Sequence, residues 1–250
     1  MEASQRIRDA VARVSDLRQL VSQSSSLSGA LSDIKAMQAR RFEATYKDLL
    51  ESPVYAGCTN FFLVELYSER DYSHRDAQFA KVAKAIELTF PAHVASIAVT
   101  LAELHQTTEE LDLEMAKSWE SQREVSASER YLASWREVGQ RAKREWQLDT
   151  VLTIGEALSE LTQKRGLRLL LKMMRKPAEM TGLGDLQVFL ETGFDQFRSL
   201  ARNTEAVSEF LRIIHERESR WISHLFDTAK IPHNAKNAQS FDWAFRALGA

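Results

Sequence analysis

The sequence predicts an all-α fold, and three observations support this. The 250 residues include only 9 Gly and 4 Pro, the residues that cost about 1 and 3 kcal/mol inside a helix. Long windows are rich in Ala, Leu, Glu, Arg and Gln, and apolar residues recur in them at steps of three and four. No segment requires a strand. We therefore expect a single multi-helix bundle of about eight or nine helices with an N-terminal helical hairpin.

The periodicity places the candidate helices in order along the chain. By approximate residue range they are 7–21, 32–49, 61–67, 73–90, 91–115, 126–142, 149–176, 185–202 and 203–225. Ser73-His74-Arg75-Asp76 and Ser126-Ala127-Ser128-Glu129 have the form of capping boxes, which open helices. Pro53 ends one helix and Pro91 begins another, since proline is tolerated only in a first helical turn.

Three regions follow from this pattern. Residues 1–52 form the N-terminal hairpin, with a hinge in the serine-rich stretch 22–29, and the hairpin could pack on the remainder of the chain. Residues 53–229 form the helical core, in which 177–184 is the clearest loop. Residues 230–250 form a polar tail that ends in a short amphipathic helix from Phe241 to Leu248.

Composition excludes some classes of protein and indicates a compartment. A net charge of -2 argues against general nucleic-acid binding, which needs a basic face for the phosphates. No stretch has the roughly 18 apolar residues that a transmembrane segment needs, and Met1 to Arg6 lack the apolar core of a signal peptide. The single cysteine, Cys58, fits a reducing compartment. We expect a cytoplasmic protein.

The stretch 61–76 is the most specific in the chain. It reads Phe-Phe-Leu-Val-Glu-Leu-Tyr and then carries alternating charges, and its apolar residues would cover every side of a short helix, which predicts burial on all faces. A buried carboxylate at Glu65 would need a charged partner. We interpret the stretch as an ion-pair motif that fixes a helix corner, with a ligand or catalytic site as the alternative. Its members are Glu65, Arg70, Asp71, Arg75 and Asp76.

These residues also support a resemblance. Phe61 to Tyr67, with Arg75-Asp76-Ala77-Gln78-Phe79 after it, resembles the bacterial family named for its FFLEELY motif, although Val64 replaces the first glutamate of that motif. The resemblance covers roughly residues 58–112 and implies a helical, cytoplasmic, bacterial protein. It implies no substrate, cofactor or catalytic residue.

Metal chemistry is an alternative, because helical bundles of this size can hold two iron or manganese ions between facing helices. The candidate ligands are Glu65, His105, Glu109, Asp112 and His215. His105, Glu109 and Asp112 are spaced by four and three residues and share one helix face. The paired Glu-x-x-His signature of such sites does not occur in the sequence, so we predict no cofactor and keep iron or manganese as the alternative.

A basic amphipathic helix is the third feature. Residues 164–176 contain six basic residues and no acid, and such a helix can lie on an anionic lipid surface or bind an acidic partner. The candidate residues are Lys164, Arg165, Arg168, Lys172, Arg175 and Lys176. The alternative is a core helix whose long basic side chains reach solvent. The aromatic segment Phe241 to Phe245 could bind the same chain or another subunit.

Two classes of function remain open. The first is a non-enzymatic interaction or regulatory protein that uses the basic helix or the aromatic tail to bind a protein partner or a second copy. The second is a metal-dependent oxidase-like enzyme or a small-molecule binder with a polar site inside the bundle. The sequence favours the first, because the second needs separated residues to converge in space. Whether the protein is an enzyme stays open.

Overall fold

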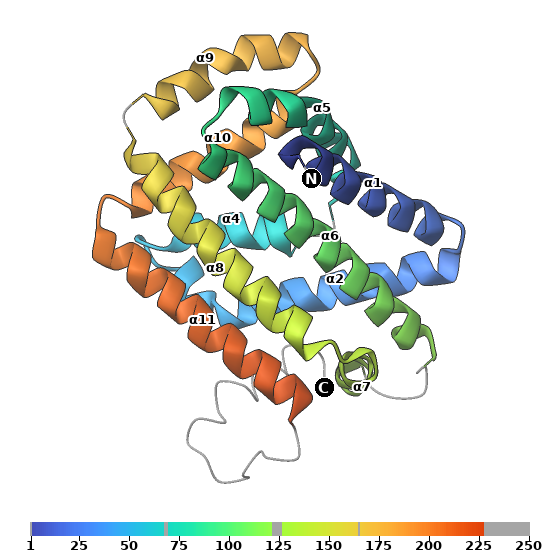
Figure 1. The fold of residues 1–250 in the computed structure, drawn as a ribbon. Coiled ribbons are helices and arrows are strands. Elements are labelled where there is room, and N and C mark those ends of the chain that lie inside the picture. Colours follow the sequence, from blue (N-terminus) through green and yellow to red (C-terminus); the bar gives the residue numbers. More distant parts are fainter. Residues whose placement is uncertain (1, 68–69, 122–126, 165, 228–250) are drawn as a thin grey trace.

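The computed structural model describes residues 2–67, 70–121, 127–164 and 166–227, which form eleven helices and no strand (Figure 1). The prediction of an all-α fold is confirmed. The helices are α1 (Ala3–Ser22), α2 (Ser25–Thr45), α3 (Lys47–Leu50), α4 (Ala56–Leu66), α5 (Ser73–Thr89), α6 (Ala92–Ser121), α7 (Ala127–Val138), α8 (Arg141–Gln163), α9 (Leu167–Met180), α10 (Gly184–Leu200) and α11 (Thr204–Phe226). None of the described helices is both long and apolar enough to cross a bilayer.

The predicted count of eight or nine helices is too low for two local reasons. The four-residue helix α3 is too short to show a periodicity. The segment predicted as one helix over 149–176 is two, because Gly166 has a φ of 92°, in the region that side chains with a β-carbon avoid. The glycine therefore separates α8 from α9.

Several predicted helix boundaries are wrong: α2 begins at Ser25 and not near 32, and α8 begins at Arg141 and not near 149. Two of the sequence signals for helix ends also fail. Ser73 is the first residue of α5 and does not cap it; its backbone N–H instead donates to Asp71 Oδ1 at 2.8 Å. Pro177, expected in a loop, lies in the last turns of α9, where its missing N–H removes only one backbone hydrogen bond. The second predicted capping box begins at Ser126 and the terminal helix at Phe241, and both starting residues lie outside the described part of the chain.

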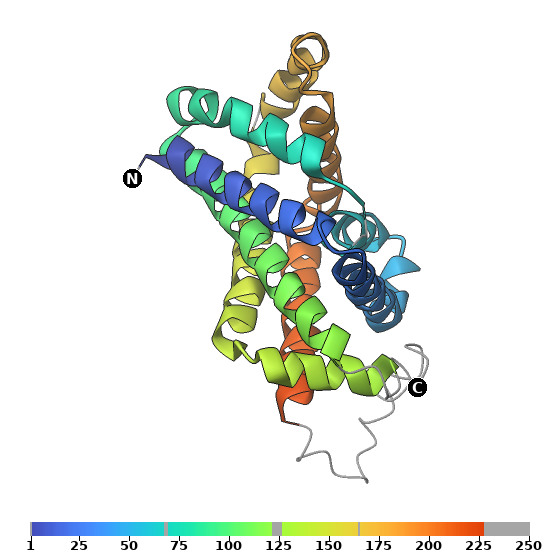
Figure 2. The same cartoon turned by 90° about the vertical axis from the view of Figure 1, so that its right-hand side faces the viewer.

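Helix α6 organises the N-terminal half of the molecule. α1, α2, α5, α7 and α8 all pack against it, and Figure 2 shows α1 lying across α6 beside α5. Ile7 and Ala10 of α1 are buried against Ala83 of α5 and Val99 of α6. Both N-terminal helices thus contribute to the packed interior, whereas the domain boundaries predicted at 52 and 229 remain predictions.

A second core joins the C-terminal helices to the 61–67 motif. Phe62 of α4 packs against Phe197 of α10 and Phe210 of α11, with ring centroids 6.0 and 5.6 Å apart. α8 and α11 run side by side along this core (Figure 1). The expectation that α4 is buried on all faces is wrong, because Leu66 is 37% exposed. α4 therefore has an exposed edge at Asn60 and Leu66, while Leu63, Val64 and Glu65 are half-buried.

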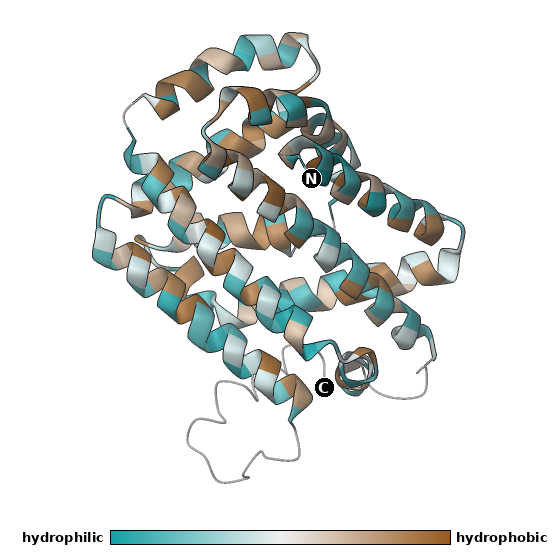
Figure 3. Cartoon of the chain, in the orientation of Figure 1, coloured by the Kyte–Doolittle hydropathy of each residue, from teal (hydrophilic) through white to brown (hydrophobic). Residues whose placement is uncertain are grey.

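α9 is the least integrated helix of the described part of the chain. It packs mainly on α10, and Ala178 is the one residue of α9 that is fully buried. α9 lies at the top of Figure 3 and contains brown, apolar stretches. Leu169, Met173 and Met180 of this helix are 63%, 66% and 87% exposed. α9 thus presents an apolar face to solvent.

Candidate functional site

A cavity of about 210 Å³ lies in the interior between nine of the eleven helices. Only α3 and α9, among the described helices, contribute no residue to it. Leu66 of α4 and Leu190 of α10 both line the cavity and are 37% and 42% exposed, so the cavity reaches the surface between these two helices. Its walls combine aromatic and aliphatic side chains with thirteen polar side chains, tyrosines not included. These polar side chains carry a carboxylate, a basic group, an amide or a hydroxyl.

Arg41 of α2 and Glu218 of α11 form the most complete ion pair of the cavity. Arg41 Nη1 and Nη2 donate to the two carboxylate oxygens of Glu218 at 2.9 and 3.0 Å. The Tyr46 hydroxyl donates to Glu218 Oε1 at 2.9 Å. Burial alone would lower the pKa of Arg41, but the Glu218 carboxylate reverses the direction and the pKa is raised. The bidentate geometry and the additional donor make this a strong, charge-assisted contact.

Two further acids of α6 face the cavity beside α2. Lys35 Nζ donates to both oxygens of Glu109 at 2.8 and 3.0 Å. Asp112, only 2% exposed, accepts a hydrogen bond from Gln38 Nε2 at 2.8 Å. Burial raises the pKa of Asp112, against the opposing effect of Lys35 and Arg144. The Asp112 carboxylate therefore has a weaker preference for its charged form than an ordinary aspartate.

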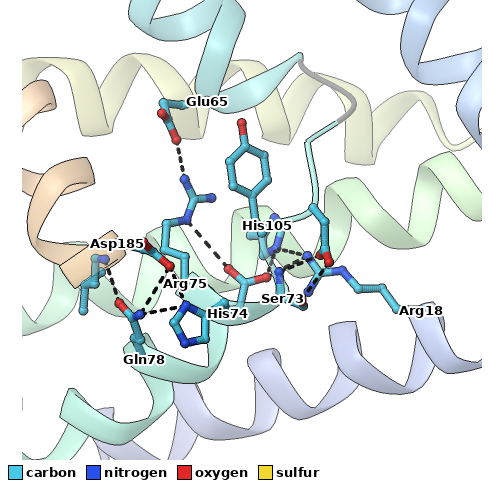
Figure 4. Close-up of polar contacts among 12 residues, drawn as sticks. Arg18, Glu65, Ser73, His74, Arg75, Gln78, His105 and Asp185 are labelled. Atoms are coloured by element: carbon cyan, nitrogen blue, oxygen red, sulfur yellow. Dashed lines mark hydrogen bonds and ion pairs between the residues drawn. The ribbon is translucent and has the colours of Figure 1, made fainter. Parts of the chain in front are cut away.

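Asp76 is the centre of a network at the other end of the cavity (Figure 4). Its Oδ2 atom lies 2.7 Å from Arg18 Nη2 and 2.9 Å from His105 Nε2. Burial raises the pKa of Asp76, but the hydrogen bonds and charges of His105 and Arg18 outweigh it, and the pKa is lowered. The network joins α1, α5 and α6.

Glu65 binds Arg75 in the same region, and Figure 4 shows the two side chains pointing toward each other. The Arg75 guanidinium also lies over the Tyr72 ring at 3.9 Å and the Phe189 ring at 4.5 Å. Of the other residues predicted for this motif, Asp71 accepts hydrogen bonds from Ser73 at the start of α5, and Arg70 is exposed. The structure thus brings together Glu65, Arg75 and Asp76.

Arg144 of α8 differs from the other cations of the cavity. It is 7% exposed, and its plane stacks on Trp135 at 4.2 Å. Nη1 donates to Gln147 Oε1 at 3.4 Å, whereas Nε and Nη2 are buried without a hydrogen-bond partner among the described residues. Burial lowers the pKa of Arg144, as expected for a cation that is desolvated and not ion-paired.

The structure brings together four of the five predicted metal ligands. Glu65, His105, Glu109 and Asp112 line the cavity, whereas His215 is exposed on α11. Each of the four already binds a protein partner. Among the described residues, no group of three His, Cys, Asp or Glu side chains is placed to hold a metal ion.

The basic residues around α9 lie outside the cavity. Arg168 and Arg175 bind Asp195 and Glu191 of α10 through ion pairs, and Lys164 Nζ lies 3.0 Å from His93 Nε2. Lys172 and Lys176 are exposed. Arg165 lies outside the described residues.

Sequence reasoning missed most of the cavity cations. Arg41 and Arg144, and the acid Glu218, look like ordinary surface residues in the sequence because each has charged neighbours along the chain. A signal exists: Glu218 follows Ile214 by four residues and precedes Trp221 by three, so it occupies a position of the apolar stripe of α11. Charged residues at stripe positions are candidates for buried polar sites.

Comparisons with other proteins identify a family but no characterised relative. Neither the curated proteins nor the solved structures include a match to the chain. A family model described as a domain of unknown function, DUF8198, matches residues 17–232, a range that contains every residue of the cavity lining except Val11. The chain belongs to the DUF8198 family.

Proposed function

We propose that the protein binds a small, mostly apolar organic molecule inside the cavity. The observation that supports this is the cavity itself, which combines apolar walls with charged groups and reaches the surface between Leu66 and Leu190. A core cavity of roughly 150 Å³ can hold benzene, and drug-sized sites take about 300 Å³ or more. A volume of about 210 Å³ suits a metabolite of about ten non-hydrogen atoms.

Because the cavity opens beside Leu190, a substitution at that residue tests whether ligands bind inside it. Leu190→Trp narrows the cavity at an exposed position, where the larger side chain costs little stability. Val188→Trp is the matched control, since Val188 lies on the same helix, is 66% exposed and does not line the cavity. Calorimetric titration of the wild type with 1-octanol and 3-phenylpropanol should give dissociation constants on the order of 0.1 mM, at roughly 0.5 kcal/mol per non-hydrogen atom.

We expect Leu190→Trp to weaken binding of both alcohols at least tenfold and Val188→Trp to leave it unchanged. Absence of binding to the wild type would contradict the proposal. Unchanged affinity in a folded Leu190→Trp protein would place any binding elsewhere.

The interaction function favoured by the sequence has one specific observation in its support. The outer face of α9 exposes Leu169, Met173 and Met180 beside Lys172 and Lys176. An apolar face flanked by lysines fits an anionic lipid surface. Flotation with phosphatidylserine vesicles at low salt tests this second candidate. Absence of binding to the vesicles would overturn the lipid-surface candidate, and so would binding that survives the double substitution Met173→Ser with Lys172→Glu. A molecular mass that rises with protein concentration would indicate instead that α9 binds a second copy of the chain.

The remaining sequence-based expectations gain less support. The carboxylates expected to bind iron or manganese already bind protein cations or amides through at least one oxygen each. Metal analysis of protein purified without chelator tests that alternative, and stoichiometric metal lost on His105→Ala would favour it. The FFLEELY resemblance, a bacterial origin and a cytoplasmic location stay proposals.

A further inference from the structure

Two polar atoms of the cavity lining have no hydrogen-bond partner among the described residues and remain open to the cavity. Asp112 uses Oδ1 to accept from Gln38 Nε2 at 2.8 Å, and its Oδ2 atom accepts from no described residue. The hydroxyl of Tyr131 on α7 likewise makes no hydrogen bond within the described chain. Neither atom is fully enclosed by protein, unlike Nε and Nη2 of Arg144. Both atoms can therefore bind a molecule inside the cavity.

These two atoms lie at the deep end of the cavity. Asp112 and Tyr131 are each 2% exposed, whereas Leu66 and Leu190 at the opening are 37% and 42% exposed. Helix α6 lines the cavity from Leu101 to Asp112, a run of about 16 Å at roughly 1.5 Å per residue. The cavity is therefore long enough for a ligand that carries its polar group at the deep end and an apolar body along the walls.

Asp112 and Tyr131 supply complementary hydrogen-bonding groups to the same region. Burial raises the pKa of Tyr131, and the charges of Arg41, Arg144, Asp112 and Glu218 act on it as well. The Tyr131 hydroxyl therefore keeps its proton at neutral pH and can donate it. An ionised carboxylate, by contrast, can only accept. The deep end thus offers one donor and one acceptor.

The lining offers no unbalanced charge to an ionic ligand. Its described residues include five carboxylates and four lysine or arginine side chains. Arg18 of α1 is a fifth cation, because it binds Asp76 from outside the lining. Burial lowers the pKa of Arg144, and the negative charge of Asp112 opposes this effect. A charged ligand would lose its hydration without gaining a counter-charge, so an uncharged ligand fits the cavity better.

We infer that the cavity selects uncharged hydroxyl compounds, whose O–H donates to Asp112 Oδ2 and whose oxygen accepts from the Tyr131 hydroxyl. A hydroxyl group can donate and accept, whereas a carbonyl group can only accept and would leave the carboxylate without a partner. This inference rests on the proposed function and names the ligand class. The apolar body of the ligand would lie along Phe62 and Leu148, which line the same cavity.

A matched set of ligands tests the inference on the full chain. The compounds 4-phenylbutan-2-ol and 4-phenylbutan-2-one share one carbon skeleton and differ only in the polar group. Protonated 4-phenylbutan-2-amine and 3-phenylpropionate are the charged arms. Titration calorimetry at pH 7 should show the alcohol binding at least tenfold more tightly than the ketone, as expected for one hydrogen bond to a charged group. Both ions should bind more weakly than the alcohol.

Substitutions separate the roles of the two side chains. In Asp112→Asn the Oδ1 atom can still accept from Gln38, so the amide nitrogen takes the place of Oδ2 and presents a donor. The preference should then move from the alcohol to the ketone. Tyr131→Phe should weaken both compounds and leave the alcohol preferred. Tyr55→Phe is the matched control, because Tyr55 does not line the cavity, and it should leave both affinities unchanged.

The outcomes distinguish this inference from the proposed function. Equal binding of alcohol and ketone by the wild type would overturn the hydroxyl inference while the cavity proposal stands, and this comparison needs no variant. Tighter binding of either ion would overturn the inference as well. So would an unchanged preference in a folded Asp112→Asn protein, or unchanged affinities in Tyr131→Phe. If none of the four compounds binds the wild type, the cavity proposal fails first.

Discussion

The arginines of α9 and Arg144 of the cavity behave in opposite ways. Arg168 and Arg175 belong to the most basic stretch of the chain, yet each is neutralised by an acid of α10 while exposed to solvent. Arg144 also lies in a charged stretch, between Lys143 and Glu145, yet it is buried without an ion pair. A local excess of charge is easily compensated from a neighbouring helix, whereas a single desolvated charge has large energetic consequences. Position relative to the core matters more than the number of charges.

The largest effect should come from the buried pair. Glu218→Ala removes the counter-charge of Arg41 and the acceptor of Tyr46, and stranding a buried guanidinium costs about 4 kcal/mol. Urea unfolding should show this loss as a lower midpoint with an unchanged slope. Glu216→Ala, two residues away on α11, is the control, because Glu216 pairs only with the exposed Arg212. Equal midpoints for the two variants would show that the Arg41 pair is not buried in solution.

An effect of about 3 kcal/mol is expected for Asp76→Asn, which weakens the contacts with Arg18 and His105. The pKa of Asp76 is lowered in the folded protein, so its stabilisation is present above the unfolded pKa of about 3.9 and is lost as the pH falls through the lowered folded value. Stability of the wild type should fall with acidification in that range. The Asp76→Asn protein should be less stable than the wild type at pH 7, and its free energy of unfolding should change less with pH in the acid range. If the free energies of the two proteins fall in parallel with pH, Asp76 is not the source of this pH dependence.

Arg144→Met should stabilise the folded protein, whereas the two preceding substitutions should destabilise it. Removal of an unpaired buried cation, with an apolar side chain in its place, should raise the free energy of unfolding by about 1 kcal/mol. Arg41→Met is the comparison, since it strands Glu218 and should destabilise the protein. If Arg144→Met destabilises as strongly as Arg41→Met, Arg144 is ion-paired in solution and its contrast with the paired arginines disappears.

The smallest effect is expected on α9. Arg168→Gln with Arg175→Gln breaks two ion pairs whose arginines are 40% and 54% exposed in their side chains, and solvent already screens such pairs. The thermal midpoint should not change measurably, and added salt should not alter that result. A clear loss of stability would mean that these pairs hold α9 on α10.

The 61–76 motif shows how far sequence reasoning reached into the site. It identified Glu65 as a carboxylate that needs a charged partner, and in the structure that partner is Arg75. It did not foresee that Asp76 turns inward to Arg18 and His105, because Arg18 lies 58 residues away on α1. Local spacing defines which residues share a helix face, but it does not define which helix lies opposite.

The sequence by itself determined the helices. Apolar periodicity and the scarcity of Gly and Pro predict most of the eleven, since a helix depends on interactions over three or four residues. Only the tertiary structure decided that nine of them surround one cavity and that Arg144 is buried there without an ion pair. Those properties depend on contacts between residues far apart in the chain, such as Arg41 and Glu218, which are 177 positions apart. Desolvation and pairing, which create the candidate site, arise only when such residues meet.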